Sequence, residues 1–228
     1  MSSAKHYFVT GTDTDVGKTI ATVQLIRAFV LAGYKTMGMK PIASGCELHN
    51  GIPINADVSA HQAASNVQAK LELISPYRFL PAISPHLAAA EAGVEISIQH
   101  ILECEQQLQQ IADVVIIEGA GGWLAPISDT QRIADLAQAL QAPVIVVVGM
   151  RLGCLNHALL TVNAIEQSGL QIAGWIANRI DPQFARYDEN LLHLKQHIKA
   201  PFLAEIEFSA DADKKTLHNA AIAQIACS

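Results

Sequence analysis

Residues 7–19, YFVTGTDTDVGKT, constrain the fold of this chain more than any other stretch. An apolar run of strand length leads into a turn with two glycines, and apolar residues at helical spacing begin directly afterwards, at Ile20. A strand, a glycine-containing loop and a helix in this order present free backbone N–H groups at the start of the helix, where phosphates bind. The stretch therefore predicts a polyphosphate-binding loop in an α/β protein.

The residues that end this loop suit a nucleotide with its magnesium ion. Gly17 lets the main chain approach the phosphates, Lys18 is expected to reach the β- and γ-phosphates, and the Thr19 hydroxyl is expected to bind Mg²⁺. Gly11 lies one residue earlier than in the common pattern G-x-x-x-x-G-K-[ST], and Thr12 takes its usual place, so we expect a widened loop. The alternative is an ordinary glycine-rich turn, but the strand-to-helix junction is the context that the motif requires.

Composition and charge restrict the class of protein. The chain has 228 residues, 50% hydrophobic and 16% charged, which excludes global disorder and suits one α/β domain over residues 1–228. A net charge of −6 without a Lys/Arg cluster argues against nucleic acid as a partner. The apolar runs are shorter than the ~20 residues of a membrane span, and no signal-like segment precedes the first strand. We therefore expect a cytoplasmic enzyme without membrane contact.

Strands and helices alternate along the chain. Beyond the first strand, the apolar patterns predict strands at residues 35–41, 113–119, 143–149, 172–181 and 201–206. Helices are expected from residue 57, at 85–91, 98–111, 129–141, 157–169, 184–198 and 214–225, and residues 46–56 are expected to form an exposed loop. This alternation predicts the fold of phosphate-loop (P-loop) NTPases, a mainly parallel sheet flanked by helices on both faces. Ligands of such sheets bind beyond the carboxyl ends of the strands.

Polar residues occur where ligands of such a sheet bind. Lys40 and Glu118 end two predicted strands, and Asp57 begins a predicted helix. From the residues alone, Lys40 could be a solvated lysine and Glu118 a surface acid, and Asp57 could act only on the helix dipole, worth ~0.3–1 kcal/mol. Gly153, before another helix start, leaves N–H groups that can bind a carboxylate, or it forms a tight turn with Asn156.

Four separated motifs resemble the dethiobiotin synthetase family. They are GTDTDVGKT at residues 11–19, KPIASG at 40–45, EGAGGW at 118–123 and LGCLNH at 152–157. A generic P-loop protein would share only the first. The resemblance implies that 7,8-diaminononanoate and CO₂ form a carbamate, that ATP phosphorylates it to a carbamic-phosphoric anhydride, and that the second amine closes the ring. Dethiobiotin, ADP and phosphate would be released.

The resemblance also implies roles for particular residues. Lys40 and Lys18 would be catalytic, holding two anions together. The metal ligands for Mg²⁺ would be Thr19, Asp57 and Glu118. Nucleotide-binding roles fall on Asp15, Val16, Gly17, Lys18, Thr19, Ile20, Asp57, Glu118, Gly119, Ala120, Gly121, Asn178, Arg179, Glu207, Phe208 and Ser209. Substrate-binding roles fall on Ser44, Gly153, Cys154 and Asn156. The last three would serve the neighbouring subunit of a homodimer, with the active site at the subunit interface.

Two segments leave the choice of nucleotide open. Residues 178–181, NRID, differ by one residue from N-K-x-D, the guanine-reading motif of GTPases, whereas the dethiobiotin synthetases use an asparagine here to contact adenine. In those relatives the last strand leads into proline and an aromatic residue, but here Glu207 and Phe208 follow it. ATP is favoured, and a GTP-using relative is the alternative.

A partner-regulated switch ATPase of the septum-positioning or plasmid-partition type is a hypothesis of another class. Those proteins share the general fold but usually carry a second lysine early in the phosphate loop. Residues 12–15, TDTD, contain none, and no basic amphipathic tail suggests a membrane partner.

Overall fold

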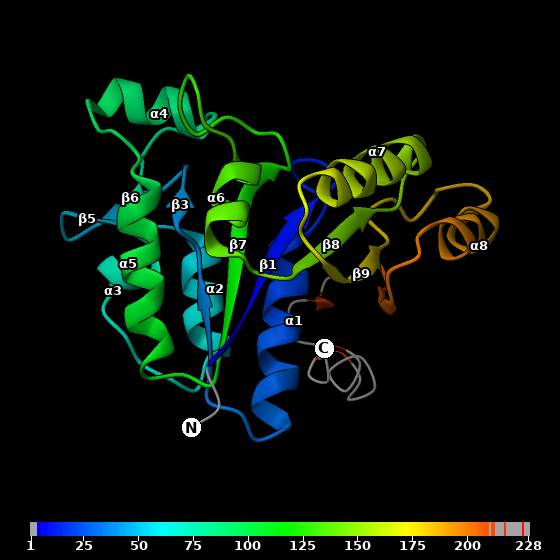
Figure 1. The fold of residues 1–228 in the computed structure, drawn as a ribbon, viewed down its shortest axis with the longest axis horizontal. Coiled ribbons are helices and arrows are strands. Elements are labelled where there is room, and N and C mark those ends of the chain that lie inside the picture. The colour runs from blue at the N-terminus through cyan, green and yellow to red at the C-terminus, as the bar shows by residue number, and fades with distance from the viewer. Residues whose placement is uncertain (1–3, 210, 213–216, 218–224, 226–228) are drawn as a thin grey trace.

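The computed structural model describes residues 4–209, 211–212, 217 and 225. Its centre is a six-stranded sheet in the order β10-β9-β8-β1-β7-β2, and every neighbouring pair is parallel (Figure 1). The strands of this sheet are β1 Lys5–Gly11, β2 Thr36–Met39, β7 Val114–Gly122, β8 Val144–Gly149, β9 Ile172–Asn178 and β10 Phe202–Ile206. The predicted fold class, a mainly parallel sheet with helices, is thereby confirmed.

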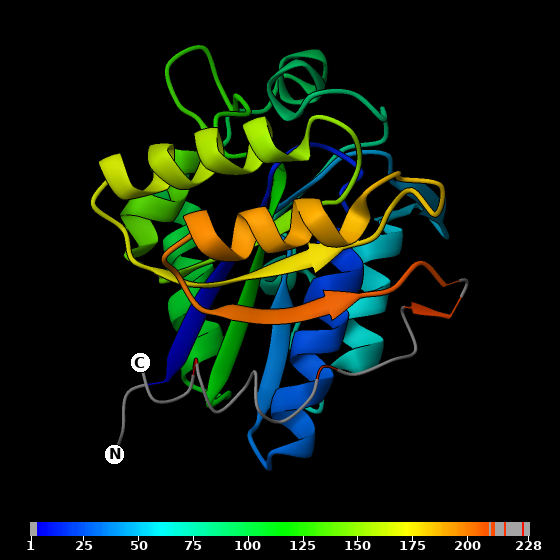
Figure 2. The ribbon, with the colours of Figure 1, turned by 90° about the vertical axis from the view of Figure 1, so that its right-hand side faces the viewer.

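Helices cover both faces of the sheet. They are α1 Lys18–Leu31, α2 Ala56–Ala64, α3 Leu71–Ile74, α4 Pro85–Ala92, α5 Ile98–Gln109, α6 Ile133–Leu140, α7 Cys154–Gln167 and α8 Tyr187–His197. Two hydrophobic cores result, one beneath α5, α6, α7 and α8 and the other beneath α1. Figure 2 shows α7 and α8 on one side of strands β9 and β10 and α1 on the other.

Alternation along the strands builds the two cores. In β7, Val115 and Ile117 enter the first core, while Val114 and Ile116 enter the second, and all four are fully buried. Successive side chains of a strand point to opposite faces, so an uninterrupted apolar run suits a strand covered on both sides. This explains why the central strands read as continuous hydrophobic stretches in the sequence.

Within residues 46–56, where we expected an exposed loop, residues 47–54 form a hairpin. Strands β4, Glu47–His49, and β5, Ile52–Ile54, pair antiparallel. The turn between them has Asn50 at φ 52° and Gly51 at φ 80°, the positive values at both central residues that a two-residue type I′ turn requires. The Asn-Gly turn signal was therefore correct, but the flanking residues are too few and too exposed to show the alternation of a strand.

Helix α6 begins at Ile133, four residues later than predicted from the sequence. The Ser128 hydroxyl accepts hydrogen bonds from the backbone N–H of Thr130 and Gln131, which competes with helix formation. The carboxylate of Asp135 then accepts from Arg132 N at 2.6 Å and caps the helix start. The predicted terminal helix falls on residues 214–225, of which the structure describes only 217 and 225, so it stays a prediction.

A further pair of strands, β3 Ile42–Ala43 and β6 Tyr77–Arg78, is parallel and lies beside the main sheet. Among the helices that the structure describes, none has the length and apolar character needed to cross a membrane.

The strand order brings the predicted functional segments to one edge. Strand β7 lies between β1 and β2, so the carboxyl ends of these three strands are adjacent. The phosphate loop follows β1, Lys40 follows β2, and Glu118 is the central residue of β7, which continues to Gly122. The side on which strands are added to the sheet also changes at β1: β7 and β2 lie on one side of it, and β8, β9 and β10 lie on the other. Ligand-binding crevices form at such switch points in parallel sheets.

Candidate active site

The phosphate loop is held in place by strand β9. Gly17 has φ 82° and directly precedes helix α1. A Cβ atom at this position would lie 2.0 Å from Nδ2 of Asn178, so the glycine is required by a close approach as well as by its backbone angle. The same Asn178 Nδ2 donates to the carbonyl of Val16 at 2.9 Å. Asn178 therefore holds the backbone of the phosphate loop in place. Its sequence context suggested contact with adenine and did not suggest this role.

Lys18, the first residue of α1, folds back over the phosphate loop. Its Nζ donates to the Asp13 carbonyl at 2.9 Å, and the side chain is buried. Burial lowers the pKa of Lys18, and the negative charge of Glu118 only partly opposes this effect. A phosphate group beside Lys18 would supply the missing counter-charge.

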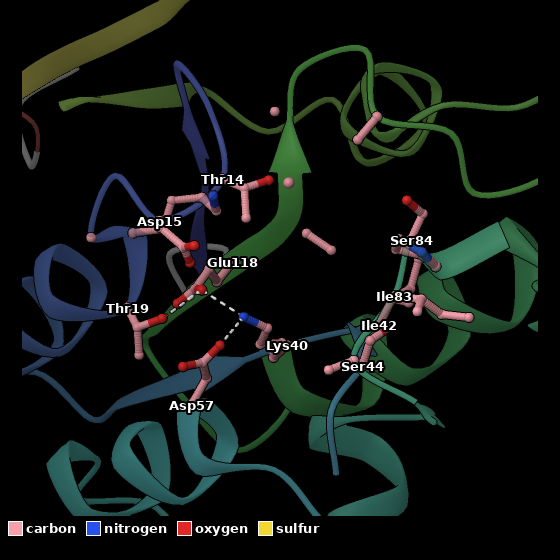
Figure 3. Close-up of a pocket in the computed structure, with 18 of the residues that line it drawn as sticks. Thr14, Asp15, Thr19, Lys40, Ile42, Ser44, Asp57, Ile83, Ser84 and Glu118 are labelled. Carbon is pink, nitrogen blue, oxygen red and sulfur yellow. Dashed lines mark hydrogen bonds and ion pairs between the residues drawn. The ribbon is translucent and has the colours of Figure 1, made fainter. Parts of the chain in front are cut away.

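Thr19 of α1, Lys40 directly after β2 and Asp57 of α2 form a cluster with Glu118 of β7. Oε1 of Glu118 accepts from the Thr19 hydroxyl at 2.9 Å and from Lys40 Nζ at 2.7 Å. Lys40 Nζ also donates to Oδ2 of Asp57. Figure 3 shows Thr19 and Lys40 directed toward the Glu118 carboxylate, and Asp57 directed toward Lys40. The structure thus brings together the three residues proposed to bind the metal, and it places Lys40 between the two carboxylates.

Local structure explains how Asp57 reaches this cluster. The side chain of Asn55 accepts hydrogen bonds from the backbone N–H of Asp57 and Val58, at 3.0 and 3.4 Å, and so caps helix α2. Asn55 Nδ2 also donates to the Ser44 carbonyl at 3.0 Å, which connects α2 to the segment after β3. Asp57 consequently lies in the first turn of α2 with its carboxylate against Lys40.

Burial and opposite charges act against each other at Glu118 and Lys40. Burial by itself raises the pKa of Glu118, but the positive charges of Lys40 and His61 and their hydrogen bonds reverse the direction and hold it far below its ordinary value. Burial likewise lowers the pKa of Lys40, and the carboxylates of Glu118 and Asp57 outweigh it and raise the pKa. Both groups are therefore charged at neutral pH.

His61 is a member of this cluster that sequence reasoning missed. Its Nε2 lies 2.7 Å from Oε2 of Glu118, and both side chains are fully buried. His61 follows Asp57 by four residues on helix α2, so the two side chains lie on the same face. That spacing was the available signal, but a histidine within an alanine-rich helix did not stand out from a core residue.

A pocket of about 900 Å³ opens over the cluster. The expected functional residues that line it are Asp15, Gly17, Lys18, Thr19, Ile20, Lys40, Ser44, Asp57, Glu118, Ala120 and Gly121. Figure 3 shows Ile42, Ser44, Ile83 and Ser84 across the pocket from the charged cluster. The pocket therefore combines a charged phosphate end with a second wall that includes apolar side chains.

Other expected residues lie outside this lining in the described part of the chain. They are Val16, Gly119, Gly153, Cys154, Asn156, Asn178, Arg179, Glu207, Phe208 and Ser209. Arg179 stacks over the Tyr187 ring at 4.7 Å, and Phe208 is exposed, at 59%. At the start of α7, Gly153 and Asn156 are exposed, whereas the Cys154 side chain is buried. Of these three residues, only the exposed pair offers side-chain or backbone surface to a second molecule.

The donor set around Glu118 fits Mg²⁺. No three His, Cys, Asp or Glu side chains gather as a metal cluster within the described residues. Mg²⁺ does not need such a cage, because it is usually bound by one or two carboxylates together with substrate phosphates and water. Asp57 and Glu118 share the Lys40 ammonium, and Thr19 adds a hydroxyl oxygen, so the residues present are hard oxygen donors in one place.

Comparisons with known proteins identify the family of this chain. A protein family described as an AAA domain matches residues 5–216. The chain is 47% identical to the ATP-dependent dethiobiotin synthetase BioD of Nitrosospira multiformis, over 95% of this chain and 94% of that protein. It is 46% identical to the enzyme of the same name from Xanthomonas axonopodis, over 92% and 94% of the two chains. BioD 1 of Salmonella typhi is 47% identical over 89% of each chain.

Solved structures show a similar fold at much lower identity. The septum site-determining protein MinD from Pyrococcus horikoshii, complexed with Mg-ADP, has a TM-score of 0.58 at 15% identity, covering 99% of this chain and 90% of that one. The MinC:MinD complex of Aquifex aeolicus gives 0.57 at 14% identity, covering 98% and 95%. These likenesses extend to the fold alone, whereas the relatives at 46–47% identity separate this chain from septum-positioning switches. The chain belongs to the family of ATP-dependent dethiobiotin synthetases and is an ATP-dependent ligase of biotin synthesis.

Proposed function

We propose that the pocket joins 7,8-diaminononanoate to CO₂ and closes the ureido ring through a phosphorylated carbamate. One amine of the diamine attacks the carbon of CO₂ and loses a proton, giving a carbamate anion. A carbamate oxygen then attacks the γ-phosphorus of ATP, and ADP leaves. The second amine attacks the carbamoyl carbon, loses a proton, and expels phosphate, which leaves dethiobiotin.

The observation that carries this proposal is the presence of two buried ammonium groups in one pocket. Lys18 and Lys40 both line it, and both are 7% exposed. The difficult step brings a carbamate anion to a phosphate anion, and fixed positive charge in a poorly solvated site offsets their repulsion. We assign Lys18 to the phosphates, because it lies on the phosphate loop, and Lys40 to the reacting oxygen between carbamate and γ-phosphate.

The remaining residues divide between the nucleotide and the diamine. Mg²⁺ held by Thr19, Asp57 and Glu118 would neutralise charge on the phosphate oxygens. Ser44 faces the pocket beside Ile42 and Ile83, so it is placed to contact the diamine, while the apolar side chains suit its alkyl chain. Among the described residues that line the pocket, Lys18 and Lys40 are the only basic side chains.

We further propose that the substrate's carboxylate is bound by a second copy of the chain. Gly153 and Asn156, at the start of α7, are exposed and lie away from the pocket of their own chain. A helix start of this kind binds carboxylates through free N–H groups. The active site would then be complete only in a homodimer.

The test is a product assay with the purified chain. Incubation with the diamine, bicarbonate and MgATP should give dethiobiotin, ADP and phosphate in equal amounts, and omission of any one reactant should abolish the ring product. Replacing ATP with GTP or CTP measures nucleotide preference in the same assay. ATP hydrolysis without formation of dethiobiotin would contradict the proposal.

A further inference from the structure

We propose that His61 is a positioning residue that fixes the Glu118 carboxylate so that one of its oxygens faces the reaction site. His61 holds Oε2 from within the core, and Oε1 is left to Thr19, Lys40 and the metal. The inference rests on the proposed role of Glu118 as a metal ligand. It concerns how that ligand is oriented, which the proposed function does not address.

The contacts of Glu118 divide cleanly between its two oxygens. Oε2 lies 2.7 Å from His61 Nε2, on the buried side of the cluster. Oε1 accepts from Thr19 at 2.9 Å and from Lys40 at 2.7 Å, and both of these residues line the pocket. A carboxylate can rotate about its terminal bond or bind a metal through both oxygens. The bond to His61 removes that freedom and presents a single oxygen.

Burial makes this bond specific. The side chains of His61 and Glu118 are both 0% exposed, so no bulk water competes for Oε2. An ionised carboxylate only accepts hydrogen bonds, so Nε2 of His61 carries the proton in this contact. Its other ring nitrogen, Nδ1, is buried and has no hydrogen-bond partner in the described structure. The bond to Glu118 is therefore the polar contact that orients the ring.

The fold makes room for His61 and anchors its backbone. Strand β2 carries Gly38 beneath the ring, and a Cβ atom there would lie 2.7 Å from the Cβ of His61. The N–H of Gly38 donates to the Ser65 hydroxyl at 3.1 Å, and that hydroxyl donates to the His61 carbonyl at 2.7 Å. Helix α2 is thereby fixed against β2 at the residue that reaches Glu118, which is the arrangement expected of a supporting contact behind a metal ligand.

The experiment compares His61→Gln, His61→Asn and His61→Leu with the wild type. Glutamine places an N–H donor near the position of Nε2, asparagine is a matched amide too short to reach Glu118, and leucine removes the donor. Electron paramagnetic resonance measures Mn²⁺ affinity of each protein loaded with ADP, and calorimetry in EDTA measures ADP affinity without metal. Glu118→Gln is the reference for loss of the ligand itself.

We expect His61→Leu and His61→Asn to weaken Mn²⁺ binding about 10- to 100-fold, the usual effect of losing a contact behind a metal ligand. His61→Gln should recover most of this loss. ADP affinity in EDTA should stay within about twofold in all three, because His61 is not in the lining of the pocket. A role in packing alone would instead place His61→Leu, which keeps the buried volume, closest to the wild type, so stronger Mn²⁺ binding by His61→Gln than by His61→Leu separates the hydrogen bond from packing.

Equal Mn²⁺ affinity in His61→Gln and His61→Asn would overturn the proposal, even if His61→Leu fails to fold. Wild-type Mn²⁺ affinity in Glu118→Gln would overturn both this proposal and the metal role of Glu118. If the expected order of Mn²⁺ affinities is found but the wild type makes no dethiobiotin, the role of His61 stands and the proposed function is wrong.

Discussion

Lys18 and Lys40 lie in the same pocket, but their pKa values are shifted in opposite directions. Burial lowers the pKa of Lys18, whereas the carboxylates of Glu118 and Asp57 overcome burial and raise that of Lys40. The charge of Lys40 is therefore neutralised by carboxylates of the protein, whereas the charge of Lys18 would be stabilised by a bound anion. This difference suits a nucleotide-binding lysine beside a lysine that acts on the reacting atoms.

Replacement of the two lysines should separate these roles. Lys40→Met is expected to lower kcat for ring closure by about 100-fold or more, because a positive charge at the developing transition state is lost. Affinity for ATP should change little. Lys18→Met should weaken ATP binding as well. Steady-state kinetics with calorimetric titration of a non-hydrolysable ATP analogue measures both, and near-normal turnover of Lys40→Met would show that Lys40 has been misassigned.

Glu118 should make the free energy of unfolding of the metal-free protein depend on pH under acidic conditions. Its pKa is lowered on folding from an ordinary value of 4.5, because Lys40 and His61 outweigh burial. Below about pH 4.5 the unfolded chain binds a proton that the folded chain does not, so the free energy of unfolding falls as pH falls and is unaffected above this range. One such group contributes a slope of up to about 1.4 kcal/mol per pH unit.

Urea unfolding in EDTA between about pH 3 and 4.5 measures this slope. Glu118→Gln cannot ionise, so its slope should be smaller than that of the wild type even though its overall stability is also lower. Identical slopes for the two proteins would show that Glu118 is not held ionised by the fold.

At the scale of elements, helix α2 connects local structure to the site. It carries Asp57 and His61 on one face, and Asn55 caps it. Asn55→Ala should reduce the free energy of unfolding by about 1 kcal/mol through loss of the cap. Turnover should fall too, because Asp57 lies in the first turn and its position depends on how the helix begins.

Ser97→Ala is the matched control for this helix cap. Ser97 caps α5 by accepting from the His100 N–H at 3.3 Å, and α5 contributes no residue to the pocket lining. Thermal or urea unfolding should show a comparable loss in both variants, whereas only Asn55→Ala should lose activity. Equal activities would mean that the start of α2 does not position Asp57.

Elements with a regular pattern were predictable, and irregular ones were not. The continuous apolar runs before Glu118 and in residues 143–149 identified buried parallel strands, because both faces of the sheet are covered. The short hairpin at residues 47–54 and the delayed start of α6 depend on turn geometry and on the Ser128 hydroxyl, which carry no periodic signal.

The same contrast holds for the site. Thr19 was predicted because it ends the phosphate-loop motif, and Lys40 and Glu118 were predicted because each begins a motif that resembles the dethiobiotin synthetases. The structure places the three residues in contact. His61 was missed because its importance depends on β7 passing behind α2, a tertiary relation that a single helix does not display. The expected nucleotide and substrate roles of these residues remain predictions.

For the molecule as a whole, the order of strands decides where chemistry takes place. Strand β7, between β1 and β2, carries Glu118 to the phosphate loop on one side and to Lys40 on the other. The three strands are separated in the chain by long crossovers, so only the complete sheet forms the cluster. We therefore expect one cooperative unfolding transition, as for a single domain, and two resolved transitions by calorimetry would contradict this.

A homodimer with shared active sites predicts complementation between two inactive variants. Lys40→Met disables the pocket, and Asn156→Asp places a negative charge where the substrate's carboxylate would bind. In a symmetric dimer, half of the mixed molecules are hybrids, and each hybrid has one intact site of two. Equal mixing after subunit exchange should therefore restore about a quarter of wild-type activity. No recovery in dimers shown to have exchanged would place both residues in one subunit's site.

The most direct measurement of the proposed reaction follows oxygen from bicarbonate into phosphate. When a carbamate oxygen attacks the γ-phosphorus and ring closure expels phosphate, that oxygen leaves with the phosphate. Turnover with oxygen-18 bicarbonate in unlabelled water, sampled before the label exchanges, should therefore give phosphate carrying one labelled oxygen for each dethiobiotin formed. Formation of dethiobiotin together with unlabelled phosphate would contradict the phosphorylated carbamate and the role we assign to Lys40.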